Sequence, residues 1–239
     1  MTMLRSAVFM VWFAVLSVAI NVLCLPFLLM PRRVAKFAPW LWCTMVLLGL
    51  KYICDLDCEI RGRVPPDGAL VAAKHMSMLD AILLYYTLSD AAFVIKRSLL
   101  LIPVWGWFAW KMQMIAIDRE GHASALRKMA AAAKQALGRG RALVIYPEGT
   151  RKKPGAPPAY KPGIAAVYGQ LGVACTPVAL NSGQFWTGFR KKRGRVVIEF
   201  LPPIPPGLPR APFMAELQDR IESATAALLA EGRARPANA

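Results

Sequence analysis

The segment HMSMLD contains a histidine and an aspartate, His75 and Asp80, at a spacing that suits acid–base chemistry. An imidazole with a pKa of about 6.5 can take a proton from a hydroxyl group at neutral pH. A carboxylate folded against one ring nitrogen would orient the imidazole and stabilise the cation that forms. A second interpretation is that Ser77 caps a helix, Asp80 lies in its first turn and His75 has no role. The stretch alone leaves both open, and they are compatible because a capped helix start is rigid.

A second polar segment, YPEGTR, follows an apolar run further along the chain. Glu148, Gly149, Thr150 and Arg151 would present a kinked backbone, free amide groups and a guanidinium. Such a turn suits a phosphate dianion, which arginine binds through two parallel hydrogen bonds. Arg119 follows the run IAID and could bind the same anion. Surface turns with ion pairs have the same composition, so each segment by itself also allows a purely structural interpretation.

Both polar segments follow predicted strands. Short runs rich in β-branched residues, bounded by glycine, proline or charge, predict strands at 57–62, 68–73, 92–96, 113–118, 142–147, 173–180 and 195–201. Helices are predicted at 79–88, around 99–111, at 123–137, at 162–171 and after Pro212. This alternation predicts an α/β fold, with a mostly parallel or mixed sheet flanked by helices. Polar residues just past the strands are then the first candidates for a site.

The first residues predict a pair of membrane-associated helices. Residues 6–31 carry no formal charge and are long enough to cross a bilayer core, which takes about 20 helical residues. The second apolar run, 37–50, is short for a span and suits a re-entrant or interfacial helix. An uncleaved anchor is favoured over a signal peptide, whose apolar core is only about 7–15 residues long. We therefore expect membrane-associated helices over 1–53 and a catalytic domain over 54–239, with 232–239 as a disordered tail.

Composition narrows the choice of partners. Thirty basic against fourteen acidic residues give a net charge of +16, and 56% of the residues are hydrophobic. Such a chain suits an anionic lipid surface or acidic substrates, and the basic run RKKRGR (190–195) adds to this. Nucleic acid is disfavoured, because zinc-finger spacing and RNA-binding aromatic strands are missing from the sequence. Cys54 and Cys58 form at most half of a metal site, so no metal is expected.

Taken together, these segments resemble the lysophospholipid and glycerolipid acyltransferase family, over about residues 55–205. HMSMLD is similar to the His-x4-Asp block of that family, Gly106 through IAIDR to its second block, YPEGTR to its third and CTPVAL (175–180) to its fourth. The departures are small. Lys74 stands where many members carry asparagine, and Tyr146 where phenylalanine is common.

The resemblance implies that His75 is a general base and Asp80 its orienting partner. It implies that a second set of residues holds the glycerol phosphate, namely Arg119, Glu148, Gly149, Thr150 and Arg151. The implied reaction moves a fatty acyl group from acyl-CoA or acyl-ACP to the sn-2 hydroxyl of lysophosphatidic acid, giving phosphatidic acid, without metal or cofactor. The expected partners are these substrates, acyl-carrier protein and membrane lipids, at the cytoplasmic side of the inner membrane.

Other acceptors are compatible with the same family: a lyso-ornithine lipid, another lysophospholipid or glycerol 3-phosphate. An alternative of another class is a membrane-anchored lipid-binding protein that has kept the fold without chemistry. The joint presence of His75, Asp80 and Glu148 argues against that alternative, because a scaffold has no need of all three.

Overall fold

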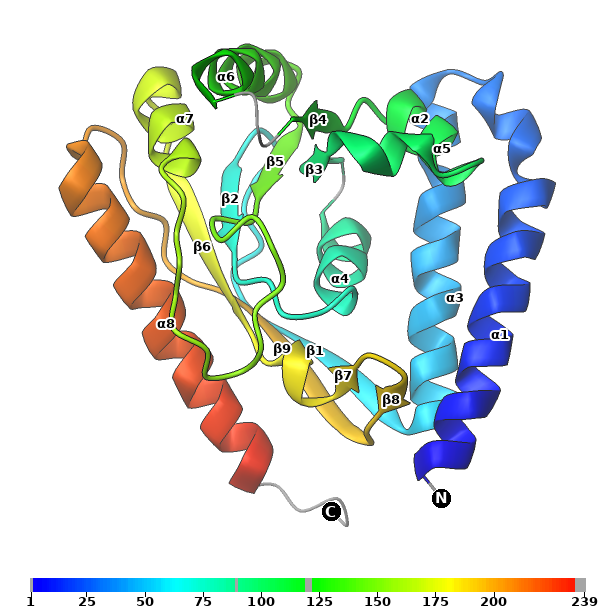
Figure 1. Ribbon diagram of the computed structural model, residues 1–239. Helices are drawn as coiled ribbons and strands as arrows, with labels where there is room; N and C mark the ends of the chain where they lie inside the picture. Colours follow the sequence, from blue (N-terminus) through cyan, green and yellow to red (C-terminus); the bar gives the residue numbers. More distant parts are fainter. Residues whose placement is uncertain (1, 89, 119–121, 235–239) are drawn as a thin grey trace.

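A mixed seven-stranded sheet forms the centre of the protein in the computed structural model, which describes residues 2–88, 90–118 and 122–234 (Figure 1). The strand order is β1-β9-β6-β2-β5-β3-β4, and neighbouring strands run parallel except β6 and β9. The α/β fold predicted from the sequence is confirmed. The strand bounds are β1 Leu56–Gly62, β2 Leu70–Ala73, β3 Ala91–Lys96, β4 Ile115–Ile117, β5 Ala142–Ile145, β6 Cys175–Leu180 and β9 Gly194–Phe200.

Helices cover both faces of this sheet. One face packs against α1 (Thr2–Leu23), α3 (Phe37–Cys54) and α4 (Leu79–Thr87), and the other against α6 (His122–Gly138), α7 (Gly163–Leu171) and α8 (Arg210–Ala234). Within β5, Val144 belongs to the first core, whereas its neighbours Leu143 and Ile145 belong to the second. Because successive strand residues point to opposite faces, central strands buried on both sides are apolar throughout, as these runs are.

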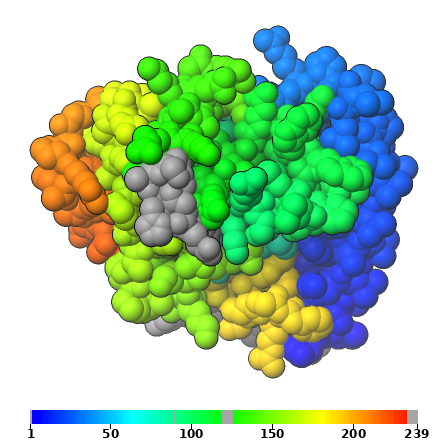
Figure 2. Space-filling model, turned by 45° about the horizontal axis from the view of Figure 1, so that its top comes forward, coloured from blue at the N-terminus to red at the C-terminus, as the bar shows by residue number. Residues whose placement is uncertain are grey.

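The N-terminal helices form one flank of the molecule, opposite α8 (Figures 1 and 2). Phe9 of α1 and Val46 and Leu50 of α3 are fully buried in the same core as the sheet. The remaining surface of α1 is apolar and exposed, at Val8, Val11, Val15, Val18 and Val22. By length and composition, Thr2–Leu23 and Arg32–Cys54 could each cross a membrane. This exposed apolar surface indicates membrane association.

The second apolar helix is longer than its uncharged run predicts. α2 (Arg32–Ala35) leads almost directly into α3, which continues through Lys51 to Cys54 and ends at Asp55 in a left-handed conformation (φ 57°). The basic residues that flank the uncharged run 37–50 are therefore part of the helical segment, which is longer than expected.

Three further features differ from expectation. The helix expected around 99–111 is split into a 3₁₀ turn, η2 (Arg97–Leu101), and α5 (Trp105–Lys111), because Pro103 lies between them and Val104 has φ 62°. A short hairpin, β7 (Trp186–Thr187) and β8 (Arg190–Lys191), is added before β9. α8 continues to Ala234, so the expectation of a disordered tail is wrong for 232–234, while 235–239 lie outside the described residues.

Much of the basic run 190–195 is engaged within the protein. The Lys191 ammonium is buried, donates to the Gly188 carbonyl at 2.8 Å and lies 4.4 Å from the centre of the Trp186 ring. Arg193 pairs with Asp55 at 3.3 Å, and Arg195 pairs with Glu59 at 3.1 Å.

Candidate active site

The His75–Asp80 pair lies between the end of β2 and the start of α4. Nδ1 of His75 is 3.0 Å from Oδ2 of Asp80, so the ring N–H can donate to the carboxylate. Asp80 is fully buried, whereas 14% of the His75 side chain is exposed. With Nδ1 facing Asp80, the second ring nitrogen, Nε2, is the one left to meet a substrate. The structure therefore brings the two predicted catalytic residues together.

Asp80 is held in one orientation by donors from its own loop. Its Oδ2 accepts hydrogen bonds from the backbone N–H groups of Met76 (2.6 Å) and Ser77 (2.8 Å). The Ser77 hydroxyl lies 3.3 Å from Oδ1 and also accepts from the Leu79 N–H at 3.1 Å. The helix begins at Leu79 with Met78 as its N-cap residue, so the prediction that Ser77 is the cap is wrong by one residue, while Asp80 lies in the first turn as predicted. The helix start and the predicted catalytic pair therefore coexist in one segment.

Ser182 also hydrogen-bonds Asp80, and this residue was not predicted from the sequence. It follows β6, in the 3₁₀ turn η3 (Ser182–Gln184), and its hydroxyl hydrogen-bonds Oδ1 of Asp80. It also lies 2.8 Å from the Ser77 hydroxyl. The rule used for the other strands, that polar residues just past a strand end are candidates, would have selected it after the run CTPVAL.

Tyr146 contacts His75, and this contact was also not predicted from the sequence. Its ring stacks on the His75 imidazole, with the centroids 3.9 Å apart and the planes 17° apart. Its hydroxyl oxygen is buried without a hydrogen-bond partner among the described residues. Burial raises the pKa of Tyr146 well above its usual value. Its place at the end of the predicted strand 142–147, beside the polar turn, was the signal for this residue in the sequence.

The EGTR turn lies directly beside the catalytic pair. The Lys152 N–H donates to the His75 carbonyl at 2.9 Å, which ties the end of the turn to the histidine. Gly149 has φ +64°, a conformation that other residues adopt at a cost, and its N–H donates to the Tyr146 carbonyl at 2.9 Å. Thr150 and Arg151 are exposed, so the guanidinium is accessible to an anion. Arg119, the other predicted phosphate ligand, lies outside the described residues.

Glu148 differs from its neighbours because its side chain is only 1% exposed. One oxygen, Oε1, is 3.2 Å from the Lys74 ammonium, while Oε2 is buried without a partner among the described residues. Burial raises the pKa of Glu148, and the nearby Lys74 charge opposes that rise. The carboxylate thus faces the protein interior, and Arg151 faces outward.

Comparison with known proteins identifies the family. Residues 55–181 match the family model described as Acyltransferase. The chain belongs to this acyltransferase family. It is 31% identical over 200 residues to the 1-acyl-sn-glycerol-3-phosphate acyltransferase of Pseudomonas aeruginosa, covering 82% of this chain and 75% of that relative. It is 29% identical to the 1-acyl-sn-glycerol-3-phosphate acyltransferase alpha of Bos taurus over 184 residues, covering 74% of this chain and 64% of that relative.

A solved acyltransferase structure has the same fold. The 1-acyl-sn-glycerophosphate (LPA) acyltransferase, PlsC, from Thermotoga maritima superposes with a TM-score of 0.77 at 18% sequence identity, covering 98% of this chain and 100% of that one. The residues matched to the acyltransferase family model include His75, Asp80 and the EGTR turn. They end at residue 181, so Ser182 lies just outside.

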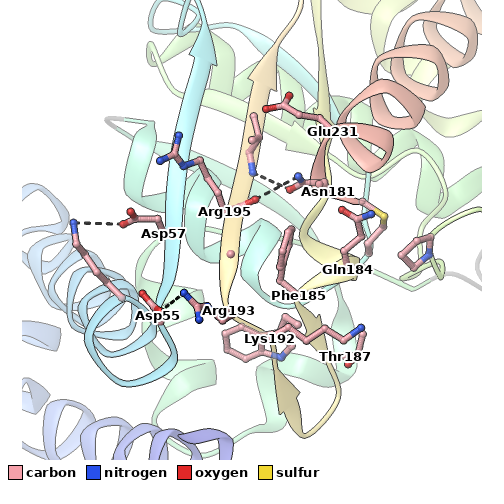
Figure 3. Close-up of a pocket in the computed structure, with 18 of the residues that line it drawn as sticks. Asp55, Asp57, Asn181, Gln184, Phe185, Thr187, Lys192, Arg193, Arg195 and Glu231 are labelled. Carbon is pink, nitrogen blue, oxygen red and sulfur yellow. Dashed lines mark hydrogen bonds and ion pairs between the residues drawn. The ribbon is translucent and has the colours of Figure 1, made fainter. Parts of the chain in front are cut away.

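A large cavity of this acyltransferase, about 1400 Å³, lies behind the catalytic pair, between β9, the β7–β8 hairpin and the end of α8. Figure 3 shows Arg193 beside Asp55 at the edge of this cavity. This pair is 3.3 Å apart, and a second ion pair, between Lys51 and Asp57, is 3.4 Å apart. Met76 lines the cavity but His75 does not. The cavity is therefore adjacent to the His75–Asp80 pair without including it.

Proposed function

We propose that this protein transfers a fatty acyl group from an acyl thioester to the sn-2 hydroxyl of lysophosphatidic acid, forming phosphatidic acid. The observation that carries the proposal is the joining of the His75–Asp80 pair to the EGTR turn, through the 2.9 Å hydrogen bond between Lys152 and His75. A base and an exposed arginine side by side suit an acceptor that has both a hydroxyl and a phosphate. The names of the curated relatives support the same reaction.

In the proposed mechanism, Nε2 of His75 takes the proton of the sn-2 hydroxyl while that oxygen attacks the thioester carbonyl. Asp80, hydrogen-bonded to Nδ1 at 3.0 Å, orients the ring and stabilises the imidazolium. The tetrahedral intermediate then breaks its carbon–sulfur bond. The leaving thiolate takes the proton from His75, which returns the base to its starting state. The ester of phosphatidic acid and a free thiol are the products, and no metal or organic cofactor takes part.

The phosphate is proposed to bind at the EGTR turn. Arg151 would hold it through its guanidinium, with Thr150 and the backbone of Gly149 as further donors and Arg119 as a second cation. A buried carboxylate would repel a phosphate, so Glu148 is proposed to act through its contact with Lys74, 3.2 Å away.

The acceptor would be reached from the membrane. Leu101, Trp107 and Trp110, on η2 and α5, are 82%, 53% and 73% exposed, and tryptophans favour a lipid interface. Their helix α5 packs against the turn that follows α1, so both apolar surfaces belong to one region (Figure 1). The net charge of +16 favours the anionic cytoplasmic leaflet of the inner membrane, and suits acyl-CoA or acyl-carrier protein as the acidic donor.

A panel of acceptors tests this function. Purified protein in detergent receives a radiolabelled acyl thioester, as the CoA or the carrier-protein form, with lysophosphatidic acid, lyso-ornithine lipid, other lysophospholipids or glycerol 3-phosphate. We expect labelled phosphatidic acid as the main product. If only another acceptor gives product, the protein is an acyltransferase of the same family with that acceptor as its substrate. No product from any pair would favour the non-catalytic lipid-binding alternative.

A further inference from the structure

A buried charge cluster connects the EGTR turn to the C-terminal helix. The Lys74 side chain is 3% exposed, and its ammonium lies 3.2 Å from Glu148 and 2.7 Å from Glu222 of α8. The Tyr160 hydroxyl, from the loop before α7, donates to Glu222 at 2.9 Å. The end of β2, the loop between β5 and α7, and α8 therefore meet in one cluster, whose lysine comes one residue before His75.

The charges in direct contact within this cluster do not cancel, although the charge of Lys152 also acts on Glu148. One ammonium faces two carboxylates, of which Glu148 is 1% and Glu222 27% exposed on the side chain. Removing the cation would leave two like charges close together with little water, and a buried charge without its partner is strongly unfavourable. Either a carboxylate would then take up a proton, or the side chains would move apart. Both responses act on Glu148, which directly precedes Gly149 of the turn, whose φ is +64°.

The turn has little freedom to absorb such a movement. The Lys161 N–H donates to the Pro147 carbonyl at 2.8 Å before the turn, and the Lys152 N–H donates to the His75 carbonyl at 2.9 Å after it. The amide groups of Gly149 and Thr150, and the base of Arg151, therefore depend on where the Glu148 side chain is held.

We propose that Lys74 and Glu222 are positioning residues for acceptor binding, acting through Glu148 on the EGTR turn. Lys74 fixes the buried carboxylate, and Glu222 fixes Lys74 from α8. The inference rests on the proposed function, because it concerns the turn assigned there to the phosphate. It adds a contribution from α8, which lies beyond the segment matched to the family model.

The test is a double-mutant cycle on steady-state kinetics. Lys74→Met, Glu222→Gln and the double variant are assayed with whichever acceptor of the panel the wild-type protein uses best, beside Lys74→Arg as the conservative variant. Glu216→Gln is the matched control, since Glu216 is on the same helix and pairs only with Arg220 at 2.5 Å among the contacts described. Thermal unfolding of each variant is measured in the same detergent.

We expect Lys74→Met to raise KM for the acceptor about tenfold or more, with a smaller effect on kcat, because an uncompensated buried charge displaces the turn. Glu222→Gln should change KM about threefold or less, and the double variant should recover at least about threefold of the loss, since the like charge is gone. Lys74→Arg should bind the acceptor better than Lys74→Met, and Glu216→Gln should behave as wild type.

Three outcomes would overturn the inference. The first is a Lys74→Met variant that melts lower but has an unchanged KM, which would make the cluster purely structural. The second is a double variant whose effects simply multiply, which would separate Glu222 from Lys74. The third, if Lys74→Met does not fold, is a folded Lys74→Gln variant, which also lacks the charge, with an unchanged KM for the acceptor. A wild-type protein that acylates only another acceptor would instead defeat the proposed function, and the cycle would still be measured.

Discussion

At the scale of single residues, the main feature of the site is a fully buried carboxylate. Asp80 is completely enclosed, and a buried carboxylate is tolerated only when hydrogen bonds replace the water it loses. Two backbone amides, two serine hydroxyls and the His75 ring supply them. The spacing of His75 and Asp80 predicted the pair, because both lie in one local segment. Ser182 comes from 102 positions away, and only the sheet brings it near.

Ser182→Ala tests this enclosure. The substitution removes one hydroxyl donor from Asp80, and a hydrogen bond to a charged group contributes about 1.5–3 kcal/mol. We expect kcat/KM to fall about tenfold or more while the protein remains folded. Ser223→Ala is the matched control, since that serine is exposed on α8 and meets Asp219. Wild-type kcat/KM in Ser182→Ala would show that the Asp80 orientation does not depend on Ser182.

At the scale of helices and strands, the sequence predicts an element correctly where a single local pattern determines it. The seven main strands were expected because each is a short β-branched run, and the sheet places their ends together. The β7–β8 hairpin has only two residues in each strand, which is too short for any periodicity. The break at Pro103 was obscured by the continuous aromatic run around it. Burial of Glu148 was not predictable, because Lys74 and Glu222 meet it only after the chain has folded.

An ion-pair cluster fixes the N-terminal helices to the sheet. Asp90 accepts from Arg32 at 2.7 Å and from Arg141 at 2.9 Å, and the Arg141 side chain is only 2% exposed. Burial alone would raise the pKa of Asp90, but the hydrogen bond from Arg32 and the charge of Arg141 lower it below its usual 3.8. Since the folded pKa is lowered, the stabilisation is present above about pH 3.8 and is lost as the pH falls through the folded value.

Asp90→Asn should therefore destabilise the protein by about 1–3 kcal/mol at neutral pH, because Arg141 loses its carboxylate. The free energy of unfolding of both proteins is measured by denaturation in detergent at pH 7 and at successively lower pH. The difference should shrink in acid, below the usual pKa of the carboxyl group. A difference that stays constant down to the acid limit would exclude this ionic origin.

At the scale of the whole molecule, the membrane-associated helices and the catalytic part share one core. Phe9, Val46 and Leu50 pack with Val71 and Val144 of the sheet, so the anchor is built into the same core as the catalytic part. The expected boundary near residue 54 marks a change of pattern in the sequence, and the packing continues across it. Apolar runs predict which segments seek lipid, but they do not reveal how much of each is buried against the protein.

Membrane binding gives a prediction at this scale. Replacing Trp107 and Trp110 together by glutamine removes exposed aromatic groups without touching the sheet, so the protein should fold and bind vesicles more weakly, about fivefold or more. Vesicle flotation measures this, with the double phenylalanine variant as control, which should retain most binding. Anionic vesicles should bind better than neutral ones, and salt should reduce the difference. If the glutamine variant floats with vesicles as the wild-type protein does, α5 does not contribute to membrane binding.

The central claim is that His75 is the base of an acyl transfer. Its most direct test is kcat/KM of His75→Ala, with lysophosphatidic acid and the preferred donor, beside His122→Ala, which alters the only other histidine of the chain. We predict that His75→Ala loses at least about 10²-fold, as expected for removal of a general base, while His122→Ala keeps wild-type activity. Equal turnover by His75→Ala and the wild-type protein would contradict the account.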